Sequence, residues 1–135
     1  MTTDKLIQEA IKARSFAYAP YSKFAVGAAL LTEDGTIFHG CNVENASYGL
    51  TNCAERTAIF SALAKGFRKF SAIAIVADTP SACKPCGACR QVLAEFCSPD
   101  MPVLLTNLSQ ETEEWTVSKL LPGSFVPSDL SDLAV

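Results

Sequence analysis

Apolar residues near the start of the chain recur at intervals of three and four, the spacing of one face of an α-helix. The residues on that face are Leu6, Ile7, Ala10, Ile11 and Ala17. Thr3 is a suitable N-cap, and Pro20 stops a helix because it lacks a backbone N–H. The spacing therefore predicts an amphipathic helix over residues 3–18.

Shorter apolar runs follow, and their lengths are those of β-strands. Residues 24–32 and 36–43 are separated by Glu33-Asp34-Gly35, a turn sequence that predicts a hairpin. The run at residues 71–77 (SAIAIVA) lacks polar alternation, which is typical of a strand buried on both faces. The remaining expected strands are residues 101–106 and 114–117.

Further helices are expected between these strands. The first covers residues 53–65 and ends at Gly66, a residue suited to the left-handed conformation that often terminates a helix. The second begins after Pro85 and continues to about residue 97, and a short one is expected at residues 118–121. This order predicts an α/β domain with a mixed sheet, antiparallel at the hairpin and parallel where a helix crosses over.

The composition of the chain agrees with a single domain spanning residues 1–135. It is 49% hydrophobic and 19% charged, which is neither a disordered nor a membrane composition. The net charge is −3 and no basic run is present, so we expect no nucleic-acid partner. No apolar run approaches the roughly 20 residues of a membrane span, and the first residues do not resemble a signal peptide. We therefore expect no membrane association and a cytoplasmic protein with reduced thiols.

Six cysteines in such a chain need an explanation other than disulfides, and their spacing indicates a metal site. Cys86 and Cys89 are three residues apart at the start of a predicted helix, so their sulfurs face the same side. Cys53 stands at the start of another helix. The partial positive charge of a helix N-terminus favours thiolate over thiol. Three thiolates on one zinc ion with a fourth position open form the catalytic pattern, whereas four protein ligands form the structural one.

Two residues next to Cys53 have side chains suited to the chemistry of such a site. Glu55 is long enough to reach the space in front of the metal, where its carboxylate could take a proton from zinc-bound water and pass it on. Arg56 could direct its guanidinium at a ligand sulfur and offset the negative charge of three thiolates. Alternatively, Arg56 is a solvated helix arginine. The single histidine, His39, lies within a predicted strand and is expected to be half-buried rather than a metal ligand.

Five segments of the chain carry a family resemblance. They are residues 21–29 (YSKFAVGAA), 40–46 (GCNVENA), 53–55 (CAE), 85–89 (PCGAC) and 121–125 (LPGSF). The third and fourth resemble the signature of zinc nucleobase deaminases, with cysteine at the first ligand position. Together the five resemble the small, homotetrameric, zinc-dependent class of cytidine deaminases over nearly the whole chain. The resemblance implies a three-layer α/β/α fold with a mixed, roughly five-stranded central sheet.

The resemblance also implies a reaction and the residues of its metal site. Cys53, Cys86 and Cys89 would bind one zinc ion per chain. Glu55 would shuttle protons while a zinc-bound hydroxide deaminates the substrate. That substrate would be free cytidine, and also 2′-deoxycytidine, which would place the protein in pyrimidine salvage.

The other residues carried over by the resemblance contact the nucleoside. Asn42 and Glu44 would hydrogen-bond the ribose 3′-hydroxyl, Phe24 would pack on the pyrimidine, and the Ala54 N–H would meet its 2-carbonyl. Tyr48 and Phe125 would come from neighbouring subunits, so the active sites of the homotetramer would be shared. Asn42 and Glu44 are two residues apart at the end of a strand, so their side chains lie on the same side. Their oxygens can accept a hydrogen bond from a sugar hydroxyl, and the negative charge would repel a 3′-phosphate. This favours a free nucleoside as the substrate.

Three alternatives remain open. Cys83 could join the three proposed ligands in a structural four-cysteine zinc site of a module without catalysis. Cys86 and Cys89 could instead form a redox dithiol, although Cys53 and Glu55 would then have no role. An aminonucleoside-antibiotic deaminase would share the zinc signature, but residues 42–45 (NVEN) favour cytidine.

Overall fold

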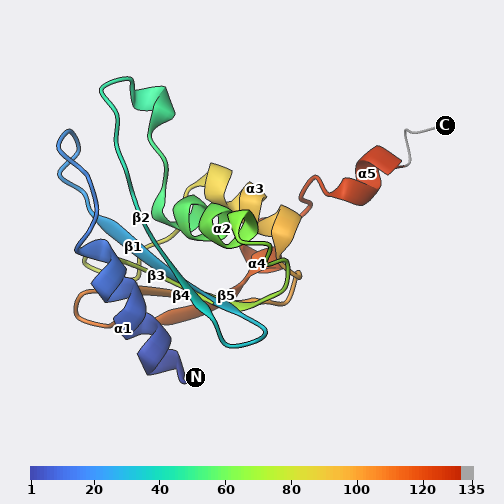
Figure 1. Ribbon diagram of the computed structural model, residues 1–135. Helices are drawn as coiled ribbons and strands as arrows, with labels where there is room; N and C mark the ends of the chain where they lie inside the picture. The colour runs from blue at the N-terminus through green and yellow to red at the C-terminus, as the bar shows by residue number, and fades with distance from the viewer. Residues whose placement is uncertain (132–135) are drawn as a thin grey trace.

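The computed structural model describes residues 1–131 and contains a five-stranded sheet with helices on both faces (Figure 1). The helices are α1 (Thr3–Arg14), α2 (Ala54–Ala64), α3 (Gly87–Phe96), α4 (Val117–Leu120) and α5 (Pro127–Ser131), with a 3₁₀ turn, η1, at Tyr48–Leu50. The strands are β1 (Val26–Thr32), β2 (Ile37–Cys41), β3 (Phe70–Ala77), β4 (Pro102–Asn107) and β5 (Glu113–Thr116). Within residues 1–131, no helix is long and apolar enough to cross a membrane.

The strand order in the sheet is β2-β1-β3-β4-β5. β1 and β2 form the predicted antiparallel hairpin, and β1 is also antiparallel to β3. β2 and β3 therefore run in the same direction on either side of β1, and α2 connects them. β3 and β4 are parallel, as expected for a connection through a helix, and β5 pairs antiparallel with β4. The mixed sheet expected from the sequence is confirmed.

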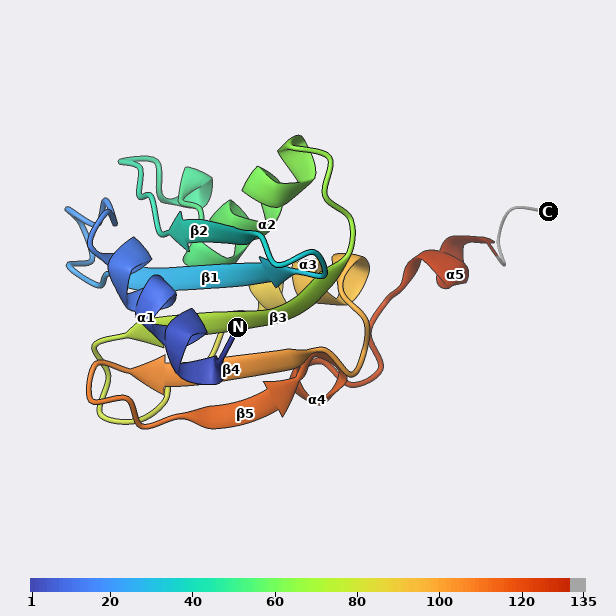
Figure 2. The same ribbon diagram turned by 60° about the horizontal axis from the view of Figure 1, so that its bottom comes forward.

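Two apolar layers, one on each face of the sheet, make up the core. The layer under α1 contains Leu6, Ile7, Ala10, Ala29, Ala74, Val76 and Leu104. The larger layer, under α2, α3 and α4, includes Leu30, Ile59, Ile73, Ile75, Leu93, Val103 and Leu105. Successive residues of β3 thus point into opposite layers, which explains its continuous apolar run. Figure 2 shows α1 in front of the strands and α3 behind them, so the expected three-layer α/β/α arrangement is confirmed.

The first helix is shorter than the apolar spacing predicts. Its N-cap is Thr2, whose hydroxyl accepts a hydrogen bond from the Lys5 N–H, and the helix ends at Arg14 instead of residue 18. The predicted extent was wrong because Tyr18 pairs with the segment after β2. Its N–H donates to Asn42 O and its carbonyl accepts from the Glu44 N–H, both at 2.9 Å. This tertiary pairing draws the chain out of the helix.

The helices that carry the cysteines begin where the sequence predicts. Cys53 is the N-cap of α2 and Cys86 is the N-cap of α3, each with an extended backbone. α2 is followed by Gly66, whose φ of +89° is the left-handed conformation expected there. Two elements were not predicted, namely η1 and α5. The segment after α4 carries α5 away from the sheet (Figures 1 and 2).

Candidate metal centre and active site

Three thiols come together where the N-termini of α2 and α3 meet. Cys53 Sγ lies 3.7 Å from Cys86 Sγ, which lies 3.4 Å from Cys89 Sγ. All three sulfurs are within 4.8 Å of one another. A tetrahedral zinc ion with Zn–S distances of about 2.3 Å requires sulfurs about 3.8 Å apart. The donor atoms and their spacing therefore fit a zinc ion, with one tetrahedral position left for another ligand.

Arg56 contacts this cluster directly. Its Nη2 donates a hydrogen bond to Cys53 Sγ at 3.1 Å, and its Nε is buried without a hydrogen-bond partner among the described residues. The pKa of the Cys53 thiol is lowered to about 5, and the largest cause is a hydrogen bond with Cys89. Burial acts in the opposite direction, and the hydrogen bond from Arg56 lowers this pKa further. The hydrogen bond between Cys53 and Cys89, together with burial, raises the pKa of Cys89. The Arg56 guanidinium thus lies against the thiol cluster.

Glu55 lies in the first turn of α2 and is only 3% exposed. Burial raises the pKa of its carboxyl above the ordinary value, while a hydrogen bond with Cys89 acts in the opposite direction. Glu55 also lines the cavity described below, together with Cys53 and Cys86. A buried carboxyl next to three thiols can exchange a proton with a molecule in that cavity.

A cavity of 240 Å³ borders on the thiol cluster. The residues singled out from the sequence that line it are Phe24, Asn42, Glu44, Cys53, Ala54, Glu55 and Cys86. Five further lining residues were given no role by the sequence analysis, namely Ser22, Val26, Thr51, Ile75 and Lys84. Cys83, which the sequence analysis considered only as a fourth ligand of a structural zinc site, also lines the cavity. Val26 and Ile75 come from β1 and β3, where their one sequence signal was hydrophobicity. The cavity therefore combines an apolar wall with acidic and amide groups.

Asn42 and Glu44 both line the cavity, but much of their hydrogen-bonding capacity is already used. Asn42 Oδ1 accepts from the Val26 N–H at 2.9 Å, and Asn42 Nδ2 donates to Phe24 O at 2.7 Å. One N–H and one lone pair of this amide remain for a ligand. Glu44 accepts from the Ser22 hydroxyl and from two backbone N–H groups of the same turn. Glu44 is therefore held as a charged acceptor at the cavity wall.

Three other residues named in the sequence analysis lie outside this cavity. Tyr48 is 74% exposed and its ring packs edge-on against that of Tyr21, with 5.9 Å between the ring centroids. Phe125 is exposed on the segment between α4 and α5. His39 Nε2 pairs with Glu9 Oε2 at 2.6 Å between β2 and α1, outside the thiol cluster, and the histidine is exposed rather than half-buried as expected.

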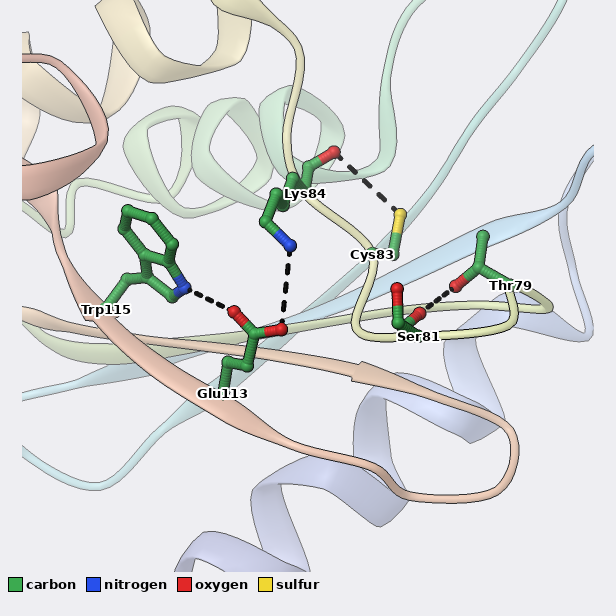
Figure 3. Close-up of polar contacts among 6 residues, drawn as sticks. All are labelled: Thr79, Ser81, Cys83, Lys84, Glu113 and Trp115. Atoms are coloured by element: carbon green, nitrogen blue, oxygen red, sulfur yellow. Dashed lines mark hydrogen bonds and ion pairs between the residues drawn. The ribbon is translucent and has the colours of Figure 1, made fainter.

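The loop between β3 and α3 carries Cys83 and Lys84 and is held by β5 (Figure 3). Lys84 Nζ lies 3.6 Å from Glu113 Oε2, and Trp115 Nε1 donates to Glu113 Oε1 at 3.0 Å. The Cys83 thiol donates to Lys84 O at 3.9 Å and lines the cavity, but it is not one of the three clustered sulfurs. The cluster within the described residues thus contains three cysteine sulfurs, without that of Cys83.

A close approach between α2 and β2 brings the start of α2 over the sheet. A Cβ atom on Gly40 would lie 2.2 Å from Ala54 O and 2.5 Å from Ala58 N, far inside contact distance. Only glycine permits this separation, because every other residue carries a Cβ. Gly40 therefore determines how closely the helix start that carries Cys53 and Glu55 lies to the sheet.

Comparison with known proteins identifies the family. Residues 1–105 match the model described as the cytidine and deoxycytidylate deaminase zinc-binding region. A cytidine deaminase from Sporosarcina psychrophila is 64% identical over 131 residues, which cover 97% of this chain and 96% of that protein. A cytidine deaminase from Halalkalibacterium halodurans is 58% identical over 132 residues, which cover 98% of this chain and 100% of that protein. The chain therefore belongs to the cytidine and deoxycytidylate deaminase family.

Solved structures agree with this assignment. The crystal structure of a cytidine deaminase from Burkholderia pseudomallei has a TM-score of 0.91 and 57% identity, and the match covers 93% of this chain and 100% of that chain. The structure of a cytidine deaminase from Mycobacterium tuberculosis has a TM-score of 0.79 at 40% identity, covering 93% and 98%. The mixed α/β fold described above is thus the fold of cytidine deaminase crystal structures, and the family and fold expected from the sequence resemblance are confirmed.

Proposed function

We propose that this protein deaminates free cytidine, and also 2′-deoxycytidine, to uridine or deoxyuridine with release of ammonia. The observation that carries the proposal is the cavity in which the thiol cluster, a buried Glu55 and the charged acceptor Glu44 meet. Cys53, Cys86 and Cys89 would bind one zinc ion per chain. Bound to these thiolates, zinc supplies the activation of water by lowering its pKa towards roughly 7.

Glu55 would move the protons that this reaction requires. Hydrolysis at C4 of cytosine needs a proton removed from water, a proton added to ring N3 and a proton on the departing amine. One carboxylate can perform all three transfers in sequence if it reaches both the water and the base. The position of Glu55 on the cavity wall beside the ligand cysteines supports this role. Arg56 would offset part of the negative charge of the three thiolates.

The remaining lining residues would hold the nucleoside. Phe24 would pack on the pyrimidine and the Ala54 N–H would donate to its 2-carbonyl. Glu44, together with the free part of the Asn42 amide, would bind the ribose 3′-hydroxyl. A phosphate at that position would meet the Glu44 carboxylate and be repelled, so a substrate with a free 3′-hydroxyl is favoured over one with a 3′-phosphate.

We also propose that the chain is a single cytidine deaminase domain, residues 1–135, that assembles as a homotetramer. Tyr48 and Phe125 are exposed, and Phe125 lies two residues before α5, with its carbonyl accepting a hydrogen bond from Gln91 Nε2 of α3 at 2.8 Å. This exposure supports a role for both residues in the active sites of neighbouring subunits, where they would complete the cavity. With these substrates the protein would act in pyrimidine salvage, and we propose that it does so in the cytoplasm.

Ammonia release from cytidine, 2′-deoxycytidine, adenosine and an aminonucleoside antibiotic by the zinc-loaded protein tests the proposal. We expect turnover of the first two nucleosides and not of the others, with one zinc per chain by metal analysis. Turnover of the antibiotic alone would assign the alternative deaminase activity. A protein that binds zinc but deaminates none of these compounds would refute the proposed function.

A further inference from the structure

The hydroxyl of Ser22 joins two parts of the cavity wall that the proposed function uses separately. It donates a hydrogen bond to Glu44 Oε2, and its oxygen accepts one from the Phe24 N–H at 3.0 Å. Lys23, between these two hydrogen-bonded residues, has a φ of +60°, a left-handed conformation uncommon outside glycine. Such backbone strain persists where surrounding contacts hold it in place and is concentrated at binding sites.

Glu44 receives all its described hydrogen bonds from this turn. The N–H groups of Tyr21 and Ser22 donate to its Oε1 at 3.0 Å and 3.1 Å, in addition to the Ser22 hydroxyl at Oε2. Three donors on one carboxylate favour its ionised form. Accordingly, the pKa of Glu44 is lowered, with the Ser22 side chain as the largest cause. The turn therefore fixes both the charge and the direction of this carboxylate.

The same network holds the backbone of Phe24 from both sides. Its N–H donates to the Ser22 hydroxyl, and its carbonyl accepts from Asn42 Nδ2 at 2.7 Å. Asn42, Glu44, Ser22 and Phe24 all line the cavity. Because hydrogen bonds link them in one chain, a sugar hydroxyl that binds at Glu44 also acts on the backbone that carries the Phe24 ring.

We propose that Ser22 is a positioning residue that couples recognition of the sugar hydroxyl by Glu44 to the placement of Phe24 against the base. The inference rests on the proposed function, since it assumes a nucleoside in the cavity. Ser22 keeps Glu44 aimed at the 3′-hydroxyl and keeps Phe24 where the base lies. Loss of the Ser22 hydroxyl should therefore weaken selection for a nucleoside that carries a 3′-hydroxyl.

The test compares cytidine with 3′-deoxycytidine in the unmodified protein and in Ser22→Ala. For cytidine, we expect kcat/KM to fall about tenfold or more in Ser22→Ala, as for the loss of a hydrogen bond to a charged group. For 3′-deoxycytidine we expect a clearly smaller fall in kcat/KM, so that the kcat/KM ratio of cytidine to 3′-deoxycytidine shrinks. Ser22→Thr, which keeps a hydroxyl, should restore the ratio. Ser15→Ala is the control variant, because it removes the same hydroxyl group outside the cavity, where Ser15 Oγ donates a hydrogen bond to Lys12 O.

A binding measurement provides a second readout that does not depend on turnover. Calorimetric titration with uridine, the expected product, should give about tenfold weaker binding to Ser22→Ala than to the unmodified protein, with equal zinc content. If Ser22→Ala does not fold, Ser22→Cys, whose thiol is a weaker donor, should give an intermediate substrate ratio. If kcat/KM falls equally for both nucleosides in the folded variant, or does not fall for either, the proposed role of Ser22 is overturned. If the unmodified protein does not deaminate cytidine at all, the proposed function fails instead.

Discussion

Replacing Gly40 by alanine should push α2 away from β2 and impair the thiol cluster. The new Cβ would lie 2.2 Å from Ala54 O, and ordinary contact begins at 3.4 Å, so one of the two must shift by about 1.2 Å. Cys53 and Glu55 flank Ala54 and would move with it. Overpacking of this kind costs about 1–3 kcal/mol of stability. A misplacement of about 1 Å at reacting groups lowers the rate about 100-fold.

Metal analysis, thermal melting and cytidine turnover together measure this effect. Gly27→Ala is the matched control, because its Cβ would lie 2.1 Å from Ala10 O, an equal clash against α1 on the other face of the sheet. Both variants should melt about 4–12 °C lower, at about 4 °C per kcal/mol for a domain of this size. Only Gly40→Ala should also lose zinc or turnover. Gly49→Ala, whose Cβ would have no neighbour within 4 Å in the chain, should change neither the melting temperature nor the zinc content.

Two results would refute this reasoning. If Gly40→Ala keeps one zinc per chain and turns over cytidine within about threefold of the unmodified rate, the close approach does not position the site. If Gly27→Ala loses zinc to the same extent, the effect is general destabilisation and not a displacement of α2.

Three further predictions concern the proposed site. Glu55→Gln should keep its zinc and its melting temperature but lose at least about 100-fold in turnover, as expected for a proton shuttle; a near-normal rate would contradict the assignment. Cys86→Ala should lose zinc in metal analysis whereas Cys83→Ala should keep one ion per chain, and loss of zinc from both variants would instead favour a four-cysteine site. Phe125→Ala should be badly impaired on its own. If each pocket takes Glu55 and Phe125 from different chains, refolding this variant together with Glu55→Gln should leave about a quarter of the pockets with both residues intact and restore activity. If mass measurement shows mixed tetramers but no activity is restored, both residues of a pocket come from one chain.

Much of the fold could be predicted from local sequence patterns, because interactions within a few residues specify turns and helix ends. The hairpin at Glu33-Asp34-Gly35 and the helix end at Gly66 depend on glycine at positive φ, at +92° and +89°. The N-terminal position of Cys86 and its spacing from Cys89 are likewise properties of one helix turn. The extent of α1 was mispredicted, because the pairing of Tyr18 with residues more than 20 positions away outweighs the continuing apolar spacing.

The sequence by itself determined which side chains could form the site, and the tertiary structure decided how they meet. The candidate metal-binding thiols could be recognised from the three-residue spacing of Cys86 and Cys89 and from their positions at helix starts, since both features lie within one helix turn. The approach of Cys53 to Cys86 spans 33 positions and depends on the packing of α2 against β2, which no local pattern encodes. The hydrogen bond from Ser22 to Glu44 spans 22 positions and requires a left-handed Lys23, which the residue itself disfavours. Contacts of this kind arise from packing between distant segments, and for that reason they became visible only in the folded chain.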